Sequence, residues 1–82
     1  MSSMDIANVY SAEGTVAGSS VITFPWRPRK VVVTNDSVIN NITVTIKGQA
    51  LTLKPTETLT AKLTLSDLTL AGNADYRVWG FG

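Results

Sequence analysis

The chain has 82 residues, no His, no Cys and charged residues at only 16% of its positions. The absence of His and Cys excludes His-based general base catalysis, Cys nucleophiles and metal sites built from these two ligands. The net charge of +1 and the isoelectric point near 8.1 do not provide the basic surface that is typical of a nucleic-acid-binding domain.

A chain of this length forms one domain of modest stability, because folding buries only roughly 60–65% of the unfolded surface. Neither a disulfide nor a ligand cluster for a metal adds stability here. We therefore expect no cofactor. We expect the chain to associate with others, as a homo-oligomer with a trimer preferred, or to dock on a larger assembly.

The sequence shows neither a secretory signal nor an apolar run of the roughly 18–20 residues that span a membrane. We expect a soluble protein that is made in the cytoplasm, with no membrane partner and no nucleic-acid partner.

Residues 1–20 differ from the rest of the chain, because Ser, Ala, Gly and Asn dominate and the apolar positions are widely spaced. They are predicted to form either a flexible arm that orders on a neighbouring subunit, or a frayed terminus or edge strand. Residues 21–82 are predicted to form a single domain.

From residue 21 onward apolar and polar residues alternate with the period of a half-buried strand. Strands are predicted over residues 21–24, 29–34, 41–47, 50–53, 58–65, 68–70 and 75–82, with a tight turn at Gly48 and Gln49 and a loop over 71–74. Seven or eight short strands predict an all-β fold, a small antiparallel β-sandwich or jelly roll. The predicted core is Ile42, Val44, Ile46, Leu51, Leu53, Leu59, Leu63, Leu65, Val78 and either Val32 or one of Val31 and Val33.

The acidic residues do not suggest a catalytic pair or a metal site. Several of them lie in predicted turns, where Asp caps the backbone, and two lie in the N-terminal segment. These residues are Asp5, Glu13, Asp36, Glu57, Asp67 and Asp75. We expect no catalytic residues, no metal ligands and no enzymatic activity.

The segment over residues 24–30 concentrates aromatic, proline and basic residues. Trp26, Arg27 and Arg29 are candidates for partner binding, because Trp and Arg are enriched at the energetic centres of protein interfaces. Two alternatives stay open. The segment is a small nucleic-acid patch with one stacking aromatic, or it is an edge loop whose Trp covers an open end of the fold.

The last strand ends in aromatic residues with no polar tail. Its alternation places Tyr76 and Val78 on one face and Arg77 and Trp79 on the other, with Phe81 close by. If the first pair fills the core, then Arg77, Trp79 and Phe81 face outward and are candidates for partner binding. The alternative is that all three aromatic side chains pack in the core.

Four stretches together resemble small virion proteins of tailed bacteriophages. They are FPWRPR (residues 24–29), VVVTNDS (31–37), ITVTI (42–46) and YRVW (76–79), and the resemblance extends over about residues 21–82. It implies a capsid decoration, or cement, protein that is located in the virion, binds the major capsid protein or other virion subunits, and is trimeric or seated at a symmetry axis. Such a protein would bridge neighbouring capsid subunits and stabilise the shell.

Two other functions are compatible with the sequence. One is a tail or fibre module of the same kind of virion, with contact to host-surface glycan, and the other is a free carbohydrate-binding module. Exposed aromatic side chains that form a flat platform would favour the glycan functions. Aromatic side chains buried between chains would favour assembly.

Overall fold

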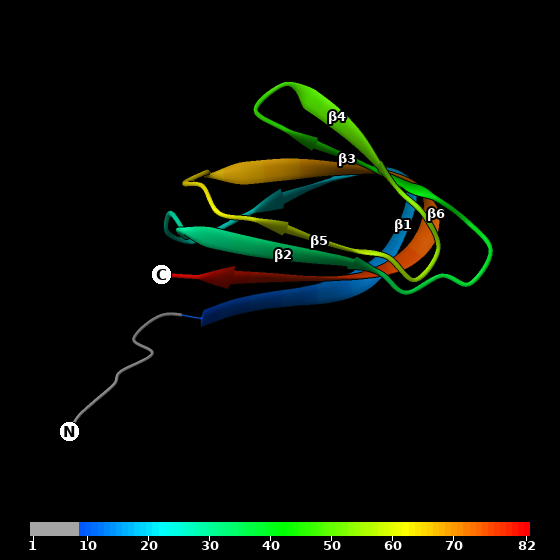
Figure 1. Cartoon of the computed structure of the whole chain (residues 1–82), viewed down its shortest axis with the longest axis horizontal. Helices are drawn as coiled ribbons and strands as arrows, with labels where there is room; N and C mark the ends of the chain where they lie inside the picture. Colours follow the sequence, from blue (N-terminus) through cyan, green and yellow to red (C-terminus); the bar gives the residue numbers. More distant parts are fainter. Residues whose placement is uncertain (1–8) are drawn as a thin grey trace.

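The computed structural model describes residues 9–82, which form six β-strands and no helix (Figure 1). The strands are β1 (Val9–Thr23), β2 (Lys30–Asn35), β3 (Ile42–Ile46), β4 (Gln49–Leu53), β5 (Thr58–Ala61) and β6 (Asp67–Phe81). Every pairing between them is antiparallel. The all-β, antiparallel class predicted from the alternation is therefore confirmed.

The strand β6 lies at the centre of the sheet. Along one edge it pairs with β1 over its whole length, from Val9 opposite Phe81 to Thr23 opposite Asp67. Along its other edge, the first half of β6 pairs with β3 and the second half pairs with β2. The strands β4 and β5 then extend the two halves, which gives the order β4-β3-β6-β2-β5.

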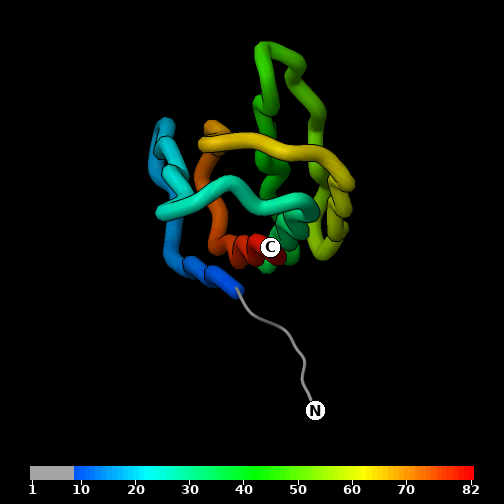
Figure 2. The backbone as a smooth tube through the Cα atoms, turned by 90° about the vertical axis from the view of Figure 1, so that its left-hand side faces the viewer, coloured from blue at the N-terminus to red at the C-terminus, as the bar shows by residue number. Residues whose placement is uncertain are grey.

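The sheet curls, because β1 and β6 bend together midway along their length and bring the two halves face to face (Figures 1 and 2). In the bend, Gly18 of β1 lies opposite Gly72 of β6, and both have positive φ angles, of 92° and 134°. A Cβ on Gly72 would lie 2.8 Å from the backbone oxygen of Asn41. Glycine at both positions lets the strands bend while they stay paired.

The prediction of seven or eight short strands is wrong, because residues 9–82 form six. The segments predicted as separate strands over 68–70 and 75–82 are one continuous strand, and the residues 71–74 predicted as a loop lie within it. The predicted strand over 58–65 ends at Ala61. The pairing of β6 with β1 continues through the bend, which a one-dimensional pattern with turn residues does not reveal.

The strands β3 and β4 form the predicted hairpin, with the turn shifted by one residue. The turn residues are Lys47 and Gly48, whose φ angles are 51° and 80°. Two positive φ angles are typical of the type I′ turn, whose twist matches that of the flanking strands.

One core fills the space between the two halves of the curled sheet. Its buried apolar residues are Val16, Ile22, Phe24, Val31, Val33, Ile42, Val44, Leu53, Leu65, Leu68, Leu70, Ala74 and Val78. Most predicted core positions are confirmed, and Ile46, Leu59 and Leu63 pack at the margin. The prediction for Leu51 is wrong, since this side chain is 48% exposed. Leu51 belongs to β4, an outermost strand, and lies opposite the buried Val44 of β3.

Part of the predicted N-terminal arm, residues 1–8, lies outside the described residues. The rest of it, residues 9–20, belongs to β1, which pairs only with β6 and so lies at an edge of the sheet. The loop over residues 24–29 then leads to β2, and its Phe24 and Pro28 are buried. Both pack against Gly80, where their side-chain atoms would lie 3.2–3.3 Å from an added Cβ.

Candidate functional site

Arg77, Trp79 and Phe81 follow one another along the outer face of β6. The residues between them, Val78 and Gly80, are buried, whereas Arg77 is exposed and the two aromatic side chains are half-buried. We call these three residues the outer row. The period-two alternation of the last strand places them together, as the sequence predicts.

The outer row is flanked by side chains from the neighbouring strands. Residues directly opposite one another in antiparallel strands project from the same face of the sheet. The residues opposite the outer row are Val9, Ser11 and Glu13 in β1 and Lys30, Val32 and Thr34 in β2. The outer row therefore lies in the middle of a continuous surface made by three strands.

A cation lies over each aromatic ring of the outer row. The guanidinium carbon of Arg77 is 5.3 Å from the centroid of the Trp79 ring. The ammonium nitrogen of Lys30 is 5.6 Å from the centroid of the Phe81 ring. Both distances are within the range of cation–π attraction. Sequence reasoning missed Lys30, because its position beside Phe81 depends on the pairing of β2 with β6.

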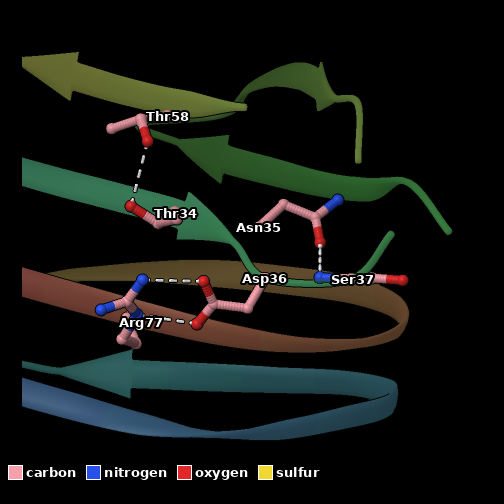
Figure 3. Close-up of polar contacts among 6 residues, drawn as sticks. All are labelled: Thr34, Asn35, Asp36, Ser37, Thr58 and Arg77. Carbon is pink, nitrogen blue, oxygen red and sulfur yellow. Dashed lines mark hydrogen bonds and ion pairs between the residues drawn. The ribbon is translucent and has the colours of Figure 1, made fainter. Parts of the chain in front are cut away.

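The Arg77 side chain is also fixed from the other side by Asp36. Its Nε donates to Oδ2 of Asp36 at 2.7 Å, and its Nη2 donates to Oδ1 at 2.9 Å (Figure 3). The hydrogen bond to Asp36 and the charge of that carboxylate raise the pKa of Arg77, and Glu13, opposite it on β1, adds a smaller effect of the same sign. A bidentate pair of this kind fixes the plane of the guanidinium.

The position of Asp36 depends in turn on Asn35, which is completely buried at the end of β2. The Nδ2 of Asn35 donates to the backbone oxygens of Asn40 and Leu53, at 2.8 and 3.1 Å. Its Oδ1 accepts a hydrogen bond from the backbone nitrogen of Ser37 at 2.9 Å (Figure 3). The turn at residues 35–37 is thus held to β4 and to the following loop, and this fixes Asp36 beside Arg77.

A shallow hollow of about 450 Å³ lies beside the outer row. It is lined by Ser11, Ala12, Glu13, Arg77 and Trp79. The lining combines a hydroxyl, a carboxylate, a guanidinium and one aromatic edge. Such a surface offers hydrogen bonds and one apolar contact to a protein side chain or to a sugar.

The other residues predicted to bind a partner lie in the loop over residues 24–29 and do not belong to the outer row. They are Trp26, Arg27 and Arg29. Arg29 adjoins the outer row, because the Arg29 backbone nitrogen donates to the backbone oxygen of Phe81 at 2.8 Å. Trp26 is half-buried and Arg27 is exposed. Within residues 9–82, no side-chain hydrogen bond, ion pair or aromatic contact joins either of these two residues to the outer row.

The charged side chains separate toward the two ends of the curled sheet. One end carries the hairpin turn, the loop over 24–29 and both ends of β6, and the other carries the bend (Figure 1). We call the first the basic end: it holds Arg27, Arg29, Lys30, Lys47, Lys62 and Asp67, a net charge of +4 from five cations and one acid. We call the second the acidic end: it holds Glu13, Asp36, Glu57, Asp75, Lys54 and Arg77, a net charge of −2 from four acids and two cations.

The carboxylates of the described residues do not gather into one cluster. Asp36 pairs with Arg77, Asp75 accepts a hydrogen bond from Thr15, and Glu57 accepts one from the backbone of Lys54. Within residues 9–82 there is no group of three acidic residues with the spacing of a metal site. This part of the chain also contains no helix long and apolar enough to cross a membrane.

No protein-family model, no curated protein and no solved structure matches this chain. The resemblance to virion proteins stays a prediction.

Proposed function

We propose that the protein is a non-enzymatic structural subunit that docks on an assembled protein shell through the outer row. The observation that carries this proposal is the arrangement of Arg77, Trp79 and Phe81 side by side on a sheet face that no other part of residues 9–82 covers. Interface centres are enriched in Trp and Arg. The ion pair between Arg77 and Asp36 and the cation over each ring fix these side chains before a partner binds. Binding then costs less side-chain entropy.

The resemblance in sequence suggests which shell is bound. A phage head decoration protein, as the resemblance implies, bridges neighbouring capsid subunits and adds buried area at their junctions. The small size of the chain, its sparse charge and its uncovered aromatic side chains suit a subunit that works in an assembled state. In this proposal the protein is located in the virion, where the major capsid protein is its partner, and it acts as a homo-oligomer, with a trimer preferred.

The proposed docking surface extends from the outer row around the basic end, where it includes Trp26, Arg27 and Arg29. Arg29 is bonded through its backbone to Phe81, so the loop over 24–29 and the outer row meet at one corner of the molecule. A shell surface that is acidic at this corner would attract the basic end before the aromatic side chains engage.

Glycan binding is the second candidate, and the hollow beside Trp79 favours it. Ser11, Glu13 and Arg77 place polar groups next to an aromatic ring, as sugar-binding surfaces do. The cations weigh against it, because a sugar stacks on the open face of a ring. The guanidinium of Arg77 lies over the ring of Trp79 and the ammonium of Lys30 lies over the ring of Phe81. This is why we place protein docking first.

The proposal is tested with empty shells assembled from the major capsid protein that is encoded with this chain. We expect Trp79→Ser/Phe81→Ser to weaken co-sedimentation with shells at least about a hundredfold. Val21→Ser is the matched control, because Val21 is an exposed apolar residue of β1 outside the outer row. If the double variant is folded by circular dichroism and binds shells as the wild type does, the outer row is not the docking surface. Binding of a glycan array by the wild type, lost in the same variant, would support the second candidate.

A further inference from the structure

Apart from the outer row, the described residues present a further apolar groove and an exposed apolar loop tip. The groove is about 320 Å³ in volume and lies where the hairpin of β3 and β4 stands apart from β5. Its apolar lining is Val44, Ile46, Leu51, Leu59, Ala61 and Leu63. The side chains of Lys47 and Gln49 form its polar rim. The groove is the unfilled margin of the core, between the outermost strands β4 and β5.

The second surface is the tip of the loop between β2 and β3. Val38 and Ile39 are 77% and 79% exposed, the highest exposures of any large apolar residue described. The loop is nevertheless ordered by hydrogen bonds. Ser37 Oγ accepts from the backbone nitrogens of Ile39 and Asn40, at 3.2 and 3.0 Å. The side chains of Val38 and Ile39 are thus exposed to solvent on an ordered loop.

The groove and the tip lie toward opposite ends of the molecule. The strand β3 begins at Ile42 beside the bend and ends at Ile46 near the basic end, where the hairpin turn lies. The loop with the tip projects beyond the strands at the acidic end (Figure 1). The Asn40 side chain fastens this loop to the bend by donating to the backbone oxygen of Asn73 at 2.7 Å. A chain therefore cannot place its own tip in its own groove.

The charges around the two surfaces have opposite signs. Lys47 lines the groove and Lys62 adjoins it, both at the basic end. Asp36, Asp75 and Glu57 surround the base of the tip at the acidic end, where the acids, with Glu13, outnumber the cations Lys54 and Arg77 by four to two. A second copy approaching with its acidic end toward the basic end of the first meets attraction, whereas two like ends repel. The charges therefore favour the same head-to-tail orientation that the apolar surfaces require.

We propose that copies of this chain associate head to tail, with Val38 and Ile39 of one copy inserted into the groove between β4 and β5 of the next. The occupant of the groove is thus a second copy of the chain. The contact is heterologous, so it closes into a ring if the rotation between copies allows, and otherwise continues as a filament. A ring of three would give the trimer expected from the sequence. This inference does not depend on the proposed docking of the outer row.

The first test is the mass of the purified wild-type chain by sedimentation velocity at increasing concentration. We expect a multiple of the 8.8 kDa chain mass. The association should weaken at least about tenfold when the salt concentration is raised from about 50 mM to about 500 mM, because the attraction between the two ends is screened. A wild-type chain that stays monomeric at millimolar concentration overturns the proposal.

The second test separates a head-to-tail contact from a symmetric one. The tip variant is Val38→Ser/Ile39→Ser, and the groove variant is Leu51→Asp. Each replaces only residues that are at least 48% exposed, so circular dichroism should show an unchanged fold. We expect each variant alone to be monomeric, with association weakened about a hundredfold. Val21→Ser, at an exposed position outside both surfaces, should associate as the wild type does.

Mixing the two variants is the decisive step. The tip variant keeps an intact groove and the groove variant keeps an intact tip, so an equimolar mixture should form a dimer of twice the 8.8 kDa chain mass and nothing larger. An interface in which tip meets tip, or groove meets groove, would not be restored by mixing, because one partner of each mixed pair still carries the changed surface. A mixture that stays monomeric, or variants that keep the wild-type mass, overturn the proposal.

Discussion

Arg77 and Asp36 form two hydrogen bonds, at 2.7 and 2.9 Å, although 41 residues separate them in the chain. This pair ties the loop that follows β2 to the central strand β6, and it places the Arg77 guanidinium over the ring of Trp79. One ion pair thus connects the turn held by Asn35 with the proposed docking surface.

We expect Asp36→Asn to change the environment of Trp79 as well as the stability of the protein. Without the carboxylate, the guanidinium is no longer held over the ring, so the near-ultraviolet circular dichroism of Trp79 should decrease. The midpoint of thermal unfolding should fall by at most a few degrees, because the pair is partly exposed. Asp67→Asn is the control, since Asp67 is exposed at the basic end. A Trp79 signal identical to that of the wild type would contradict the coupling.

The pH dependence of this ion pair follows from the raised pKa of Arg77. A cation whose pKa is higher in the folded state contributes stability below the pKa of the unfolded state. That contribution is lost only as the pH rises through the folded value. Both values for Arg lie far above neutrality. We expect the difference in unfolding free energy between wild type and Asp36→Asn to stay constant from about pH 7 to about pH 10. A difference that vanishes within this window in urea titrations would show that another group controls the pair.

Gly72→Ala should destabilise the protein more than Gly18→Ala. Both glycines have positive φ angles, but an added Cβ meets the Asn41 oxygen at 2.8 Å only at Gly72, and nothing lies within 4 Å at Gly18. The Gly18 variant therefore measures the cost of the backbone conformation alone, about 1–3 kcal/mol. We expect the Gly72 variant to lose more than this in urea unfolding. Equal losses would mean that the bend relaxes away from the clash.

Asn35→Ala should lower the free energy of unfolding by about 2–4 kcal/mol. The variant loses three hydrogen bonds and leaves buried backbone groups without partners. Asn41→Ala, at an exposed position in the same loop, should cost less than about 0.5 kcal/mol. If the two variants unfold at the same urea concentration, Asn35 does not hold the turn as described.

Val44→Asp should prevent folding, whereas Val21→Asp should not. Val44 is completely buried, and an unpaired carboxylate there costs several kcal/mol, a large part of the stability of a domain of this size. Val21 is 62% exposed at the edge strand, so its replacement leaves the charge in water. The measurement is far-ultraviolet circular dichroism and solubility of both variants. A folded Val44 variant with an unchanged melting temperature would contradict the position of the core.

The features that depend on neighbouring residues could be predicted from the amino-acid sequence. The alternation of apolar and polar residues specifies strands, because successive side chains in a strand point to opposite faces. It therefore indicated the all-β class, the hairpin of β3 and β4, the inward direction of Val44 and Val78, and the outward direction of Arg77, Trp79 and Phe81. Even Leu51 faces the side that its alternation predicts, although nothing covers it.

The pairing of the strands, and the features that depend on this pairing, could not be predicted from the sequence. The loop predicted over residues 71–74 is strand, because β1 runs beside β6 through the bend and supplies hydrogen bonds that no local pattern records. The partners of the outer row, Lys30 and Asp36, are 51 and 41 residues away from Phe81 and Arg77. The separation of charge into a basic and an acidic end has the same origin, since the curl of the sheet gathers cations that are scattered along the chain.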